Sequence, residues 1–150
     1  MARSLLVTGA ASGIGRAVVR RFAARDWFLG LVDRDADGLA SLQSDIGGDR
    51  CCTYAADVTE PAEMEEAVTA FGEETGGRLE VLFNSAGVME VGRFEDVDLD
   101  HHRRHFDVNL YGVVVATQAA FPLLRDTAGS RVISMASASG VYGKPELATY

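Results

Sequence analysis

A cluster of glycines near the start of the chain has the spacing of a phosphate-binding turn. Residues 8–15 read TGAASGIG and follow a short apolar run that predicts a strand. Gly9 can make the tight turn out of the strand, Gly13 can let the backbone approach a pyrophosphate, and Gly15 can let the next helix pack on the sheet. The N-terminus of that helix attracts anions. The predicted contacts to a dinucleotide are therefore Gly9, Ser12, Gly13, Ile14 and Gly15.

Glycines also gather in ordinary loops, so a second feature is needed to identify the ligand. Asp33 stands 18 residues after Gly15, at the expected end of the second strand. A carboxylate there can accept hydrogen bonds from an adenosine ribose and would repel a 2′-phosphate, which predicts NAD as the cofactor. Arg34 keeps NADP open as the less favoured cofactor, because its guanidinium can pair with that phosphate, stack on adenine or face solvent.

Short apolar runs alternate with segments of helical spacing along the chain. The runs predict strands at 4–8, 28–32, 51–56, 79–83 and 131–135. Apolar residues recur at helical intervals in 14–22, 39–46, 64–71 and 99–124, with Asp35 as a candidate cap and Pro61 opening a helix. Continuously apolar strands predict a parallel sheet covered on both faces. The expected fold class is α/β, a doubly wound Rossmann sheet in one domain spanning 1–150.

The composition is that of an ordinary globular domain and narrows the class of partner. Of the 150 residues, 47% are hydrophobic and 24% charged, and the net charge of −8 opposes binding to nucleic acid. The N-terminal apolar run is too short for a signal sequence, and no segment reaches the ~18 consecutive apolar residues of a membrane span. We expect a cytoplasmic protein with neither nucleic acid nor a membrane as its partner.

Three histidines near residue 100 raise the question of a metal site. His101 and His105 share a helix face, but no cysteine or carboxylate completes a zinc set at known spacing. With Arg103 and Arg104 among them, His101, His102 and His105 are interpreted as the solvated start of a helix. We therefore expect no metal site.

The glycine block resembles the TGxxxGIG turn of the short-chain dehydrogenase/reductase family. Further family motifs follow in order: Asp57 and Val58, then Asn84, Ser85, Ala86 and Gly87, then Asn109, then Ser137 and Tyr150, 13 residues apart. Ser85 departs from the pattern, because a second asparagine stands there in the family. The resemblance covers nearly the whole chain and is consistent with the expected strand order 3-2-1-4-5, with ligand above the carboxyl ends of the strands.

The resemblance implies an NAD(H)-dependent oxidoreductase that interconverts a secondary alcohol and a ketone by hydride transfer. Tyr150 would exchange the hydroxyl proton, Ser137 would hydrogen-bond the substrate oxygen, and Asn109 would hold a water in the proton path. Taken alone, Ser137 is more simply explained as a loop hydroxyl, and Asn109 as a polar residue bonded to backbone. The contacts to the cofactor beyond the glycine turn would be Asp33, Arg34, Asp57, Val58, Asn84, Ala86 and Gly87.

Other functions stay open beside this one. The chain could be a non-catalytic NAD-binding or regulatory module of the same fold, or an NADP-dependent carbonyl reductase. An extended-type relative acting on nucleotide sugars is a further alternative, but that type spaces its glycines TGxxGxxG, unlike this chain.

The end of the chain carries two more expectations. The family places a lysine four positions after its tyrosine, and this sequence ends at Tyr150. We expect a C-terminally incomplete domain that is inactive as given, with an active full-length parent.

The helix around Asn109 commonly packs on a second subunit in this family. Its apolar face from Phe106 to Leu124 therefore predicts a homodimer or homotetramer. Phe106 and Tyr111 are expected in the core or at that interface.

Overall fold

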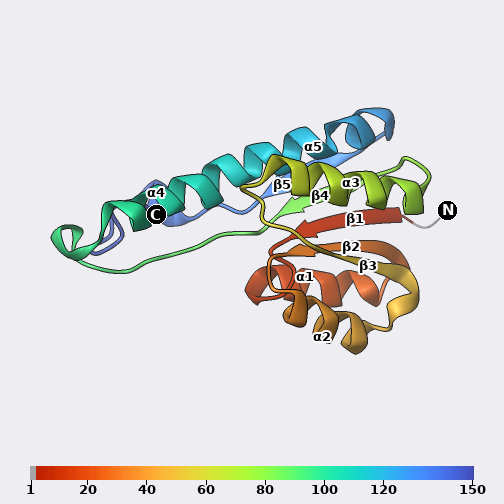
Figure 1. The fold of residues 1–150 in the computed structure, drawn as a ribbon, viewed down its shortest axis with the longest axis horizontal. Coiled ribbons are helices and arrows are strands. Elements are labelled where there is room, and N and C mark those ends of the chain that lie inside the picture. Colours follow the sequence, from red (N-terminus) through yellow and green to blue (C-terminus); the bar gives the residue numbers. More distant parts are fainter. Residues whose placement is uncertain (1–2) are drawn as a thin grey trace.

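A five-stranded parallel sheet lies between two layers of helices in the computed structural model, which describes residues 3–150 (Figure 1). The strands are β1 (Arg3–Thr8), β2 (Trp27–Asp33), β3 (Cys51–Ala55), β4 (Val81–Asn84) and β5 (Arg131–Ser134). Their order is β3-β2-β1-β4-β5, with parallel pairing throughout. The doubly wound Rossmann fold and its strand order are confirmed.

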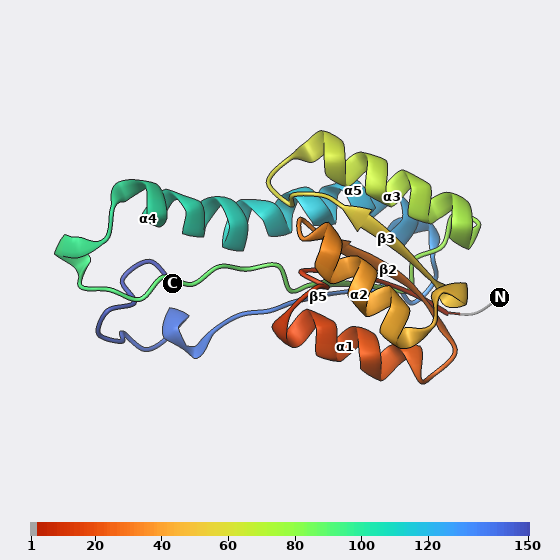
Figure 2. The same ribbon diagram turned by 60° about the horizontal axis from the view of Figure 1, so that its bottom comes forward.

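Helices cover both faces of the sheet, as the continuously apolar strands require. They are α1 (Gly13–Ala23), α2 (Ala36–Ile46), α3 (Pro61–Thr75), α4 (Leu99–Phe106) and α5 (Gly112–Asp126). Helices α1 and α2 lie on one face, and α3 and α5 lie on the other (Figures 1 and 2). Local sequence fixes their ends: Asp35 accepts a hydrogen bond from the amide of Gly38, and α3 begins at Pro61 and ends before the left-handed Gly76.

Successive residues of one strand enter different halves of the core, because side chains alternate across a sheet. Leu5 packs toward α1 and α2, and Leu6 packs toward α3 and α5. The middle of the strand, from Leu5 to Val7, therefore needs an apolar residue at every position. Buried members of the α1 and α2 side include Val7, Val19, Leu31 and Leu42, and those of the α3 and α5 side include Val32, Phe71, Leu82 and Ala116.

Strand β4 begins two residues later than predicted, at Val81 rather than Leu79. Leu79 is nevertheless fully buried, and its amide donates to the hydroxyl of Thr127, 3.0 Å away. An apolar residue can therefore be buried at the entrance to a strand without joining its ladder. Strand β5 forms an edge of the sheet, and Val132 and Ile133 on it are each 45% exposed.

The segment 99–126 is helical throughout but changes its winding in the middle. Residues Asp107–Tyr111 form a π-helical turn between α4 and α5, in which the Gly112 amide donates to the Asp107 carbonyl five residues back. Helix α4 extends beyond the sheet, beside the segments that follow β4 and β5 (Figure 2). Phe106 and Tyr111 are 57% and 49% exposed, so of the two expected places, core or subunit interface, the core is excluded and the interface stays a prediction.

Candidate functional site

The glycine turn is packed tightly against two neighbouring strand ends. Gly9 has a φ of +67°, and an ideal Cβ there would lie 2.7 Å from the backbone N of Ala86. A Cβ on Gly15 would lie 2.1 Å from the carbonyl oxygen of Gly9. Gly15 therefore allows the helix to pack on the turn itself, where the sequence suggested packing on the sheet. Neither position has room for a side chain.

Asp33 holds the turn from the side of β2. One carboxylate oxygen accepts from the amide of Ala11 at 2.9 Å, and the other accepts from the amide of Asp35 at 3.0 Å. Asp33 is half-buried, and Arg34 beside it is exposed. The carboxylate oxygens have lone pairs left for further donors, so the two backbone bonds do not exclude a ribose hydroxyl.

The outer side of the turn is open. Ser12, Gly13 and Ile14 are exposed, and Ser12 is the N-cap of α1 but makes no capping hydrogen bond with its side chain. Gly13 has a φ of +49°, and a Cβ built on it would meet no heavy atom within 4 Å. The free hydroxyl, the helix N-terminus and this open space fit an anionic group such as the pyrophosphate of a dinucleotide.

Thr8 joins the glycine turn to the segment that follows β4. Its hydroxyl oxygen accepts from the amides of Ser85 and Ala86 at 3.1 and 3.2 Å, and Thr8 is 1% exposed. These two bonds place Ala86 against Gly9. Sequence reasoning did not select Thr8 as a site residue, although its place in the TGxxxGIG pattern was a signal.

Asn109 binds the backbone of Val88, two residues after Ala86. Its Oδ1 accepts from the amide of Val88 and its Nδ2 donates to the carbonyl of Val88, both at 2.8 Å. A Cβ on Gly87 would lie 3.3 Å from that Oδ1, so the approach is close. Asn109 lies in the π-helical turn and bonds to backbone, as its simpler interpretation suggested. Each polar atom keeps capacity for one more partner, such as a water.

Three other residues selected from the sequence are occupied by structural contacts. Asn84 is 2% exposed, and its Nδ2 donates to the hydroxyls of Thr117 and Ser134. Val58 is 7% exposed and faces Gly112, which leaves its backbone rather than its side chain for an adenine. Asp57 accepts from both the amide and the hydroxyl of Thr59, at 2.9 and 2.8 Å.

Ser137 and Tyr150 both lie in the segment that follows β5, but separate contacts hold them. The Ser137 hydroxyl accepts from the amide of Ser139 at 3.1 Å. The Tyr150 ring packs edge-on against His105, with centroids 6.3 Å apart, and is 37% exposed. Within residues 3–150, no hydrogen bond joins Ser137 to Tyr150.

The interpretation of the histidines as a solvated helix start is wrong for His105. That residue is 5% exposed, and its Nε2 accepts from the amide of Glu90 at 2.9 Å. The helix lies against the segment after β4, and this covers the face that carries His105. Burial lowers the pKa of His105, nearby Arg104 and the other histidines lower it too, and Glu90 opposes the shift. A polar cavity of about 300 Å³ adjoins it, lined by Val88, Met89, Glu90, His101, Arg104 and His105.

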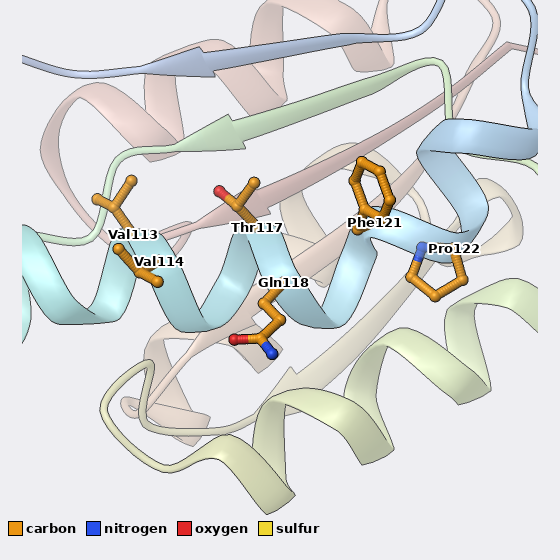
Figure 3. Close-up of a pocket in the computed structure, with 6 residues that line it drawn as sticks. All are labelled: Val113, Val114, Thr117, Gln118, Phe121 and Pro122. Carbon is orange, nitrogen blue, oxygen red and sulfur yellow. The ribbon is translucent and has the colours of Figure 1, made fainter.

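A second, apolar hollow of about 430 Å³ lies along α5 (Figure 3). It is lined by Val113, Val114, Thr117, Gln118, Phe121 and Pro122. The helical stretch Leu99–Asp126 is, by length and composition alone, apolar enough to cross a membrane, a test that core helices of soluble proteins also pass. One side of α5 packs on α3 and β4 in the present fold.

Comparison with known proteins identifies the relatives of this chain. The family profile described as short chain dehydrogenase matches residues 3–150. The chain is 36% identical over 140 residues to oxidoreductase UcpA of Salmonella typhimurium, covering 92% of this chain and 52% of the relative. It is 35% identical over 134 residues to D-threitol dehydrogenase of Mycolicibacterium smegmatis, covering 88% and 51% respectively.

A solved structure agrees with these relatives. The crystal structure of 3-ketoacyl-(acyl-carrier-protein) reductase from Brucella melitensis complexed with NADH superposes with a TM-score of 0.90 at 28% identity, covering 99% of this chain and 62% of that one. The chain spans about half the length of the curated relatives it matches. With the family profile matching from residue 3 to residue 150, the chain belongs to the short-chain dehydrogenase family.

Proposed function

We propose that this chain binds NAD(H) at the glycine turn and forms the cofactor-binding part of an oxidoreductase that interconverts a secondary alcohol and a ketone. The observation that carries the proposal is the way three strand ends converge on the turn. Asp33 from β2 bonds to Ala11, and Ala86 after β4 packs on Gly9 through its bond to Thr8. The open side faces outward at Gly13, where a pyrophosphate would lie.

Each part of the turn would hold a different part of the cofactor. The pyrophosphate would lie along Gly9, Ser12, Gly13, Ile14 and Gly15 at the start of α1. Asp33 would accept hydrogen bonds from the adenosine ribose and would repel a 2′-phosphate, which favours NAD over NADP. Further contacts would come from Arg34, Asp57, the backbone of Val58, Asn84, Ala86 and Gly87. The residues present fit a dinucleotide because none of their contacts closes the outer side of the turn.

The chemistry of the reaction would be shared between cofactor and protein. Bound NAD supplies a hydride acceptor, and NADH a hydride donor, at the nicotinamide ring. Tyr150 would exchange the proton of the substrate hydroxyl, and Ser137 would hydrogen-bond the substrate oxygen. Asn109 would position the Val88 backbone and a water in the proton path.

A second candidate is a non-catalytic NAD-binding module. Two observations favour it: the Ser137 hydroxyl accepts a hydrogen bond from the amide of Ser139, and the Tyr150 ring packs on His105. NADP-dependent carbonyl reduction is the third candidate, since the guanidinium of Arg34 is exposed beside Asp33. Binding without turnover toward secondary alcohols and ketones would support the module.

Calorimetry with NADH and NADPH tests the cofactor proposal directly. NADH should bind more tightly, and Asp33→Asn should narrow the difference, because it removes the charge and keeps one oxygen acceptor. Gly13→Val should abolish binding while the circular dichroism stays near native, since its side chain would occupy the open space. Unchanged NADH affinity in Gly13→Val would refute the placement of the pyrophosphate.

We also propose that the protein is a homodimer or homotetramer in the cytoplasm. The continuous helical segment Leu99–Asp126, here called the long helix, has exposed apolar side chains that support a subunit contact. They include Phe106, Leu110, Val114 and Phe121. Light scattering on the unmodified protein and on Phe121→Ser tests the contact. A monomeric unmodified protein would contradict it.

A further inference from the structure

The backbone that follows β4 is held to the long helix at two points, one turn apart. Asn109 binds both polar groups of the Val88 backbone, and His105 accepts from the amide of Glu90 at 2.9 Å. Residues four apart lie on one face of a helix, so both side chains meet the same segment. Asn109 has no titratable group. His105 has a titratable imidazole, and its Nε2 accepts the hydrogen bond from the Glu90 amide.

The hydrogen bond fixes the protonation state of His105. Because Nε2 accepts from the Glu90 amide, it carries no proton, and the neutral ring has its proton on Nδ1. The Nδ1 atom is buried and has no partner within residues 3–150. A second proton on the ring would turn Nε2 into a donor facing another donor. The bond to Glu90 would then be lost.

Charged and titratable groups surround this ring on three sides. The segment after β4 contributes the carboxylate of Glu90, and the C-terminal segment contributes the phenol of Tyr150. Its own helix contributes His101, His102 and Arg104. Burial is the largest influence and lowers the pKa of His105, the three neighbours on its own helix act in the same direction, and Glu90 alone opposes them. The surroundings therefore favour the neutral ring near neutral pH.

We propose that His105 is a positioning residue of this site, which together with Asn109 fixes the backbone at Val88 to Glu90 only while its imidazole is neutral. Acid then releases the Glu90 end of the segment and leaves the Val88 end bound. The ring also packs against Tyr150, so the same proton loosens the support of that side chain. Only this consequence for Tyr150 rests on the proposed function.

The sign of the effect follows from the pKa of His105, which is lower with the bond intact than the ordinary 6.5. The open segment binds a proton more readily than the closed one, so opening is favoured as the pH falls below 6.5. Linkage of a single proton raises the open population by up to about tenfold per pH unit, until the lower pKa is reached. Above pH 6.5, the ordinary pKa of histidine, the ring is neutral and the bond from the Glu90 amide to His105 is fully formed.

Amide hydrogen exchange measured by NMR on the 150-residue chain tests the proposal without any assay of turnover. The protection factor of the Glu90 amide should fall by up to about tenfold per pH unit below the ordinary histidine pKa, and that of Val88 should change little. His105→Gln should keep the Glu90 protection and remove its pH dependence, because the amide oxygen accepts but does not titrate. His105→Leu should lose the Glu90 protection at every pH.

His101→Gln is the matched control, because His101 lies 3.4 Å from the Glu90 carboxylate and makes no bond to its amide. The pH dependence should survive in that variant. If the pH dependence of Glu90 protection also persisted in His105→Gln, the proposal would be overturned. NMR titration of the His105 ring in the unmodified chain needs no variant to fold, and a midpoint at or above 6.5 would also overturn it. Absence of NADH binding would contradict the proposed function and leave this result unaffected.

Discussion

Gly9 and Gly13 share a left-handed backbone but differ in their surroundings, so alanine at each position separates two costs. The φ angle is +67° at Gly9 and +49° at Gly13. An ideal Cβ on Gly9 would lie 2.7 Å from both N and Cα of Ala86, whereas one on Gly13 would meet no heavy atom within 4 Å. Gly9→Ala therefore adds a steric clash to backbone strain, and Gly13→Ala adds strain alone.

The clash should make Gly9→Ala the more destabilising substitution by about 2 kcal/mol. A left-handed alanine costs about 1–2 kcal/mol at either site, and overpacking adds about 1–3 kcal/mol at Gly9. Ordinary contact begins at 3.4 Å, so Ala86 would have to retreat by about 0.7 Å, the difference between 3.4 and 2.7 Å. That retreat strains the bonds from Ser85 and Ala86 to Thr8, now 3.1 and 3.2 Å long.

Urea unfolding followed by the fluorescence of Trp27, the only tryptophan, measures the difference. With a urea dependence of about 2 kcal/mol per M, Gly9→Ala should unfold about 1 M below Gly13→Ala. NADH calorimetry adds a second readout, because a Cβ on Gly13 enters the space proposed for the pyrophosphate. Binding should weaken in Gly13→Ala although that variant is the more stable of the two. Equal unfolding midpoints would refute the steric reasoning.

Three further predictions concern the bonds that hold the strand ends. Thr8→Val should lower the free energy of unfolding by about 2–6 kcal/mol, because two amides lose their acceptor at about 1–3 kcal/mol each; chemical denaturation should show Thr8→Ser recovering most of the loss. Asp33→Ala should cost about 2 kcal/mol by the same measurement, since its carboxylate accepts two backbone amides; a loss under about 0.5 kcal/mol would contradict that role. Burial opposes ionisation of Glu80, but hydrogen bonds from Arg78 and Ser4 outweigh it and lower its pKa from 4.5. The stability contributed by ionised Glu80 should be complete above pH 4.5 and decline as the pH falls through the lower pKa. Glu80→Gln should flatten that part of the pH profile of Tm, and an unchanged profile would argue against the bonding.

The fold could be predicted from the sequence because its signals are local. A strand with Leu5 and Leu6 both buried reads as a continuous apolar run, and such runs occur where helices cover both faces. Asp35 and Pro61 mark helix starts within a few residues of themselves. The π-helical turn at Asp107–Tyr111 was not predicted, and Asn109 within it bonds to Val88, 21 residues away in the sequence.

Positions in the site could be predicted more readily than the bonds that its residues make. The spacing placed Asn109 on a helix, but its partner Val88 lies 21 residues away and has no side-chain signal for the contact. His105 stands beside Arg103 and Arg104, so its neighbours in sequence resemble those of a solvated residue. Only the packing of the segment after β4 decides that His105 alone among them is buried.

The contacts around the turn couple motifs that the sequence presents as separate. The turn after β1 is held by Asp33 of β2, and the segment after β4 is held by Thr8 of β1. That segment continues to Val88, which Asn109 braces from the long helix. A change at one motif therefore moves the others, because each is fixed by a neighbour's side chain rather than by its own strand. Thr8→Val should accordingly reduce the amide protection of Val88 as well as that of Ala86, whereas independent motifs would leave Val88 unchanged.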